Sequence, residues 1–127
     1  FVSKIKPSKN IIKQLVFALN VCRSVKSNSI VITQNDRTLG IGSGQPNRLD
    51  SCKIAINKMK KFTVSASNMV AASDAFFPFI DGIEKLIQSG IKAVIQPGGS
   101  MRDQEVIDAA DEHGIAMVFT GMRHFRH

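Results

Sequence analysis

The feature that most constrains the fold is a regular alternation in the second half of the chain. Three short apolar runs are centred near Ala71, Ala93 and Met117, at intervals of 22 and 24 residues. The segments between them, 81–89 and 103–113, have helical patterns, and a glycine follows each. Strands that alternate with helices at this spacing predict a βαβαβ unit with parallel strands and right-handed crossovers.

The first half has a different pattern. It predicts, in order, an amphipathic helix at 8–25, a β-hairpin from strands at 29–33 and 38–43, and a helix from about 50 to 61. Either Asp50 or Ser51 can cap the second of these helices.

The chain has 127 residues, of which 43% are hydrophobic, enough for one α/β domain with a single core. No apolar run approaches the ~18 residues of a membrane span, and no secretory signal is evident, so we expect no membrane partner. Cys22 and Cys52 are far apart and form no metal or disulfide motif, which favours a reducing cytoplasm. The first residue is Phe1 rather than Met, so we expect a piece of a longer chain.

Charge is distributed unevenly along the sequence. Residues 1–62 carry a formal charge of +10 and residues 63–127 carry −3. The basic half indicates either an anionic partner or a solvated lysine-rich surface. The lysines are dispersed and have few aromatic neighbours, so we expect no nucleic-acid partner.

Three loops follow the predicted parallel strands, at 73–81, 97–103 and 120–127. Ligands of such sheets bind beyond the carboxyl ends of the strands, where these loops converge. The sequence therefore predicts a binding site formed by the three loops.

Each loop allows a functional and a structural interpretation. The three Phe of the first loop can clamp a flat ring or fill the core, and Asp81 can bind a ligand amine or begin a helix. In the second loop, backbone N–H groups of Gly98-Gly99-Ser100 can hold an anion, or Ser100 can cap a helix.

The last loop is a short basic tail, either solvated or ordered by Phe125. Arg123 can bind a phosphate or carboxylate, and His124 or His127 can exchange protons near neutral pH. The sequence shows no metal-ligand pattern and no nucleophile-elbow motif, so we expect no metal.

Five long motifs, in one order along the chain, point further: KSNS at 26–29, GIGSGQ at 40–45, SDAFFPF at 73–79, IQPGGS at 95–100 and FTGMRHFRH at 119–127. On these motifs the sequence closely resembles the C-terminal part of the bifunctional purine-biosynthesis enzymes AICAR transformylase/IMP cyclohydrolase. The resemblance is strong from Lys26 to the end, and residues 1–25 are similar to the preceding helix.

The resemblance implies a cytidine deaminase-like three-layer α/β fold, with 1–127 as the C-terminal portion of the transformylase domain. That domain transfers a formyl group from 10-formyltetrahydrofolate, as co-substrate, to the amine of aminoimidazole carboxamide ribonucleotide (AICAR), without a catalytic metal. It also implies a cytoplasmic homodimer. The residues implied to contact AICAR are Asn28, Phe76, Arg123, Phe125 and His127. Those implied on the folate side are Arg48, Leu49, Asp81, Ser100 and Met101.

The sequence departs from the family at three points. Asn47 stands where Ser is frequent, and Ile80 stands where Arg is usual, before Asp81. The catalytic Lys-His pair of the family is absent, because no Lys-His dipeptide occurs in this chain. We therefore expect the chain alone to be inactive. A non-catalytic nucleotide-binding module and a basic nucleic-acid binder are the alternative functions.

Overall fold

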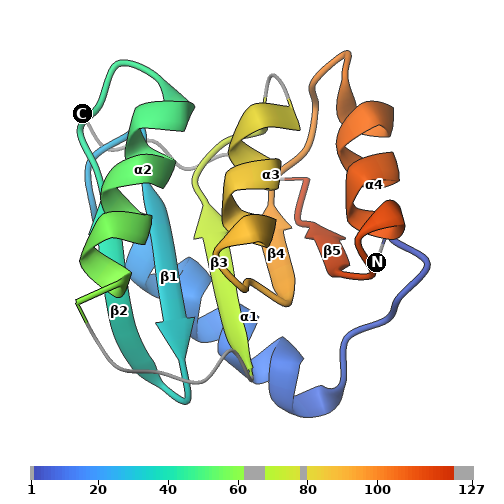
Figure 1. Ribbon diagram of the computed structural model, residues 1–127, viewed down its shortest axis with the longest axis horizontal. Coiled ribbons are helices and arrows are strands. Elements are labelled where there is room, and N and C mark those ends of the chain that lie inside the picture. The colour runs from blue at the N-terminus through green and yellow to red at the C-terminus, as the bar shows by residue number, and fades with distance from the viewer. Residues whose placement is uncertain (1, 62–67, 78–79, 122–127) are drawn as a thin grey trace.

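The computed structural model describes residues 2–61, 68–77 and 80–121 (Figure 1). Its elements are, in order, α1 (Lys9–Cys22), β1 (Ile30–Gln34), β2 (Arg37–Gly42), α2 (Arg48–Met59), β3 (Met69–Ser73), α3 (Ile80–Gln88), β4 (Ala93–Gln96), α4 (Asp103–Glu112) and β5 (Ala116–Phe119). Every helix and strand predicted from the sequence is present, with its ends within three residues of the prediction.

The strands form one sheet in the order β2-β1-β3-β4-β5. β1 is antiparallel to both β2 and β3, whereas β3, β4 and β5 are parallel to one another. A two-residue turn, Asn35-Asp36, joins β1 to β2, and both residues have positive φ, as the twist of a tight hairpin demands. The predicted α/β class, the hairpin and the βαβαβ unit are confirmed.

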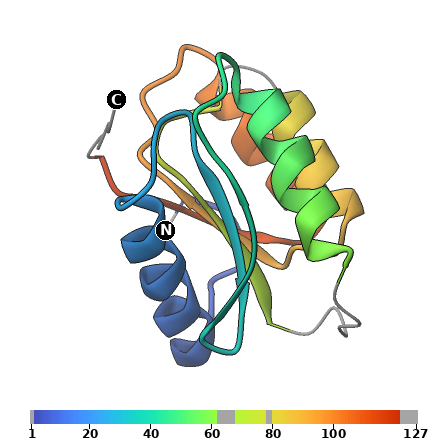
Figure 2. The same cartoon turned by 90° about the vertical axis from the view of Figure 1, so that its left-hand side faces the viewer.

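Helices cover both faces of the sheet and give three layers (Figure 2). Helix α1 lies on one face, and α2, α3 and α4 lie on the other. All five residues of β1 and of β3 are buried, because both faces of these strands are covered. Along β1, Ile30 and Ile32 join the core beneath α2–α4, while Val31 joins the core beneath α1.

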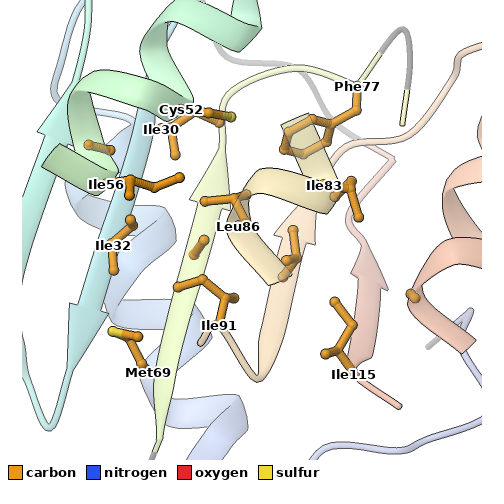
Figure 3. Packing of buried hydrophobic residues seen from close by; sticks show 14 of the residues in the cluster. Ile30, Ile32, Cys52, Ile56, Met69, Phe77, Ile83, Leu86, Ile91 and Ile115 are labelled. Carbon is orange, nitrogen blue, oxygen red and sulfur yellow. The ribbon is translucent and has the colours of Figure 1, made fainter. Parts of the chain in front are cut away.

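The larger core lies beneath α2, α3 and α4 (Figure 3). Ile83 and Leu86 of α3 are fully buried there, and Phe77 from the loop after β3 is 1% exposed. Each such side chain stabilises the fold by roughly 1.5–3 kcal/mol. Phe77 thus fills the core, as one of the two interpretations of its loop predicted.

Two glycines let α2 approach β2 unusually closely. A Cβ added at Gly40 would overlap the carbonyl of Ala55, and one added at Gly42 would overlap the carbonyl of Ser51. Both contacts are with helix backbone, which cannot rotate away. The glycines therefore set the distance between α2 and β2, and Gly42 does so at the first turn of α2, where Arg48 and Leu49 lie.

The cap of α2 differs from the prediction. Neither Asp50 nor Ser51 precedes the helix. Asn47 occupies the cap position, and its Oδ1 accepts a hydrogen bond of 2.9 Å from the backbone N–H of Asp50. Asparagine caps helices as well as serine or aspartate does. The helix therefore begins at Arg48, which places that side chain in its first turn.

Residues before α1 run beside β5, at the edge of the sheet. The N–H of Val2 donates to the carbonyl of Met117 at 3.1 Å, and Ser3 Oγ accepts from the N–H of Met117 at 2.7 Å. This pairing covers part of an edge that would otherwise expose open hydrogen-bonding groups. None of the helices in the described ranges is both long enough and apolar enough to cross a membrane.

Candidate functional site

The candidate site lies where the start of β1 meets the end of β3. Because the two strands are antiparallel, Ile30 at the start of β1 pairs with Ser73 at the end of β3. The residues just outside the sheet, Ser29 and Asp74, are therefore neighbours, and the N–H of Asp74 donates to the carbonyl of Ser29 at 3.3 Å. This is the carboxyl edge of the parallel strands, where the sequence analysis expects a site formed by three loops, and the first of these loops reaches it.

Arg48 joins three segments at this edge. Its side chain is 8% exposed, and Nη1 forms a buried ion pair with Oδ1 of Asp74. The same nitrogen donates to the carbonyl of Ser29 at 3.3 Å, and Nη2 donates to Oδ1 of Asn28 at 2.9 Å. Arg48, predicted on the folate side, thus contacts Asn28, predicted on the AICAR side.

The carboxamide of Asn28 is held from both ends. Its Oδ1 accepts from Arg48, and its Nδ2 donates to the carbonyl of Gln45 at 3.0 Å. Its backbone carbonyl accepts from Oγ of Ser51, and the Ser27–Asn28 peptide bond is cis. A side-chain amide has two N–H donors and two acceptor lone pairs. Among the described residues, these bonds leave one donor and one acceptor of the carboxamide to pair with another carboxamide.

A hollow of about 280 Å³ opens beside Arg48. It brings together three of the predicted folate-side residues: Arg48, Leu49 and Asp81. Apolar and acidic groups share its wall, which is lined by Asn47, Arg48, Leu49, Asp50, Phe77, Asp81 and Gly82. Such a wall suits a small molecule that has both apolar and polar groups.

Asp81 is exposed and lies in the first turn of α3. Both interpretations of this residue therefore fit: its charge suits the start of the helix, and it also faces the hollow. A second hollow of about 310 Å³ continues from the first between α2 and α3, and Lys53, Glu84 and Lys85 add charges of both signs to its wall.

In the loop after β4, backbone N–H groups donate to side chains of the protein itself. Those of Gly99 and Ser100 donate to the carboxylate of Asp103, at 2.7 and 3.1 Å, and that of Gly98 donates to Oε1 of Gln96 at 3.3 Å. The predicted anion cradle is therefore filled by a carboxylate of the protein. The alternative is also wrong, because Arg102 and not Ser100 stands at the cap position of α4.

Ser100 and Met101 lie in this loop and line neither hollow. Met101 is fully exposed. Phe76, predicted to contact AICAR, is half-buried next to the buried Phe77. The predicted residues Arg123, Phe125 and His127, together with Phe79 and His124, lie outside the described residues.

Asp74 is the residue of this site that the sequence did not single out. It is 4% exposed, and its partner is the arginine that also holds Asn28. The available signal for Asp74 was its place directly after a fully buried strand. A buried acid needs a basic partner, and Arg48 stands at the start of α2.

Thiol chemistry does not suit this site. Cys22, whose Sγ is 3.2 Å from Oγ of Ser29, and Cys52 are both buried. Burial raises the pKa of each thiol to about 12, so neither forms a thiolate at neutral pH. Over the described ranges, no group of three or more His, Cys, Asp or Glu is placed to hold a metal ion.

The architecture is that of the deaminases. A dCMP deaminase from the cyanophage S-TIM5 matches with a TM-score of 0.58 and 16% identity, over 90% of this chain and all of that one. A diaminohydroxyphosphoribosylaminopyrimidine deaminase/reductase from Thermotoga maritima matches with a TM-score of 0.53 and 17% identity, over 86% of this chain and 35% of that one. These likenesses confirm the predicted cytidine deaminase-like fold.

Sequence comparison identifies the relatives. The family described as AICARFT/IMPCHase bienzyme matches residues 1–58. The bifunctional purine biosynthesis protein PurH of Aquifex aeolicus is 56% identical over 126 residues, which is 99% of this chain and 25% of that protein. The PurH of Persephonella marina is 54% identical, over 96% of this chain and 24% of that protein. The resemblance to the bifunctional purine-biosynthesis enzymes is therefore confirmed, and the chain spans about a quarter of the length of these relatives.

Proposed function

We propose that this chain is the C-terminal portion, residues 1–127, of an AICAR formyltransferase, and that it supplies part of the site where 10-formyltetrahydrofolate and AICAR meet. The observation that carries the proposal is the carboxamide of Asn28, which is held by Gln45 and by Arg48, a residue that lines the first hollow. The donor and acceptor that its bonds to other described residues leave over match the carboxamide of AICAR. The identity with bifunctional purine biosynthesis proteins supports the same assignment.

The reaction demands close positioning. The amine of AICAR is a weak nucleophile, because its lone pair is drawn into the ring and the carboxamide. Catalysis therefore requires the amine and the formyl carbon to be held together, a proton to be removed, and the developing oxyanion to be stabilised.

In this proposal the described residues bind and orient. Asn28 pairs with the carboxamide of AICAR, and Phe76 packs against its imidazole ring. Leu49 and Asp81 line the folate side, where Asp81 accepts hydrogen bonds. Arg123, Phe125 and His127 complete the AICAR side, and Ser100 and Met101 the folate side. The Lys-His pair comes from outside this chain, as does the second subunit of the dimer.

Calorimetric titration of the chain with AICAR tests this assignment. We expect saturable binding that Asn28→Ala weakens about tenfold, the equivalent of ~1.4 kcal/mol for lost hydrogen bonds. Asn10→Ala is the matched control, since Asn10 is exposed in the first turn of α1, whereas Asn28 follows the last turn. No saturation by AICAR, or equal affinity of the Asn28 variant and the control, would refute the proposal.

A non-catalytic nucleotide-binding module is the second candidate, favoured by the absence of a Lys-His dipeptide. The two candidates differ on the folate side. A formyltransferase portion binds 10-formyltetrahydrofolate as well as AICAR, and Asp81→Ala weakens the former. AICAR binding that folate neither accompanies nor alters would favour the module. Formyl transfer by the chain alone would place the acid–base group within it, with His124 and His127 the first candidates.

A further inference from the structure

The ion pair between Arg48 and Asp74 is almost completely shielded from water. The exposed fractions of the two side chains are 8% and 1%. Charges buried this deeply are retained only when each has a partner. Asp74 is therefore the fixed partner of Arg48.

The two terminal nitrogens of Arg48 bond to different residues, Asp74 and Asn28. Arginine and a carboxylate frequently pair in a bidentate way, with two parallel N–H···O bonds to one carboxylate. Here Nη1 bonds to Asp74, while Nη2 bonds to Oδ1 of Asn28. Within the described ranges, Oδ2 of Asp74 accepts no hydrogen bond, which is the cost of this division.

The geometry of the guanidinium transmits the position of Asp74. The group is planar and its donors have fixed directions. Asp74 and the carbonyl of Ser29 both bind Nη1, and Asp74 is itself tied to that carbonyl by its backbone N–H. These contacts set the plane of the guanidinium, and the plane determines where Nη2 meets Asn28.

We propose that Asp74 is a positioning residue, which acts through Arg48 to hold the carboxamide of Asn28 in the orientation that binds substrate. The role in substrate binding rests on the function proposed above. The mechanical part, from Asp74 to the carboxamide, does not, and it can be measured without any ligand.

Two variants interrupt the series of contacts from Asp74 through Arg48 to Asn28, called the relay below, at different contacts. Asp74→Asn removes the charge that anchors the arginine. Arg48→Lys keeps a buried cation beside Asp74 but replaces the planar fork by one ammonium group, which cannot reach all three acceptors in the same way. If Asp74→Asn fails to fold, Arg48→Lys still tests the relay. Asp111→Asn is the matched control, because its Oδ1 accepts a backbone hydrogen bond from Lys4, outside the site.

The first readout is the NMR signal pair of the Asn28 side-chain amide, assigned with Asn28→Ala. We expect both relay variants to shift these signals and to speed their exchange with water at least tenfold, while the control leaves them unchanged. Unchanged signals in the relay variants, with the fold intact, would overturn the proposal whether or not AICAR binds.

The second readout is the affinity for AICAR. We expect Asp74→Asn to weaken binding about tenfold in the wild-type chain and to have no further effect in a chain that already carries Asn28→Ala. An equal loss in both backgrounds would mean that Asp74 acts by another route and would overturn the proposal. If the wild-type chain does not bind AICAR but the amide signals respond as expected, the proposed function fails and the positioning of the carboxamide stands.

Discussion

Gly42→Ala tests whether the close approach of α2 to β2 maintains the site. An added Cβ would overlap the carbonyl oxygen of Ser51 and lie 2.7 Å from its carbonyl carbon and 2.9 Å from its Cα. Real Cβ atoms essentially never approach other atoms within 3.0 Å. Since these atoms belong to helix backbone, α2 has to move outward by about 1 Å, a form of overpacking that typically costs ~1–3 kcal/mol.

The same movement reaches the site. Ser51 and Arg48 lie in the first two turns of α2, and they hold Asn28 by hydrogen bonds of 2.5 and 2.9 Å. A shift of about 1 Å stretches such bonds beyond their useful range. We therefore expect Gly42→Ala to lower the free energy of unfolding by about 3 kcal/mol, the upper end of that range because hydrogen bonds to Asn28 are lost as well, and also to weaken AICAR binding.

The assay is urea unfolding followed by circular dichroism, because the chain has neither Trp nor Tyr for fluorescence. Gly44→Ala is the control: it lies in the same glycine series, has φ of +69°, and meets no atom within 4 Å. Left-handed backbone in a non-glycine residue costs ~1–2 kcal/mol, without moving α2. A Gly42 variant as stable as the Gly44 variant, with undiminished AICAR binding, would refute this reasoning.

Three further predictions concern stability. Ser3→Ala leaves the buried N–H of Met117 without its 2.7 Å acceptor and should cost ~1–3 kcal/mol in urea unfolding; a change below 0.5 kcal/mol, on the order of a neutral surface substitution, would contradict this. Asn47→Ala removes the cap of α2 and should cost about 1 kcal/mol, which Asn47→Ser should largely restore. Burial raises the pKa of Cys22 and Cys52 from 9.0 to about 12, so the stability that the protonated thiols contribute is complete below pH 9 and is lost as pH rises toward 12. Each thiol contributes a slope of about 1.4 kcal/mol per pH unit in that range, and Cys52→Ala should roughly halve the measured dependence.

The fold was predictable because its second half follows one rule. Apolar runs near Ala71, Ala93 and Met117 become β3, β4 and β5, and the segments between them become α3 and α4. Local signals mark several elements, such as the glycines after α3 and α4 and Ser8 as the cap of α1. The order of the first strands was not predictable, because pairing of β1 with β3 depends on which sheet edge remains open.

The site was less predictable because its contacts join distant segments. Asp74 and Arg48 are 26 residues apart, and the sequence analysis assigned Arg48 to the folate side and gave Asp74 no role. The N–H groups of Gly99 and Ser100 looked free for an anion, since nothing in the sequence shows that the side chain of Asp103 turns back to them. Competition between a ligand and the protein's own carboxylate is decided by three-dimensional geometry alone.

The glycines at 40 and 42 connect the fold, which was predictable, with the site, which was less so. Alternate residues of a strand face the same side, so glycine at both positions leaves no side chain at the two points where β2 meets the backbone of α2, at Ser51 and Ala55. The helix can then lie close enough for Arg48 to reach Asp74 behind β1. A bulkier strand would hold α2 away from the sheet, and the buried charge of Asp74 would lose its partner. The glycine spacing, visible in the sequence as a motif, thus allows an ion pair to form between two other segments.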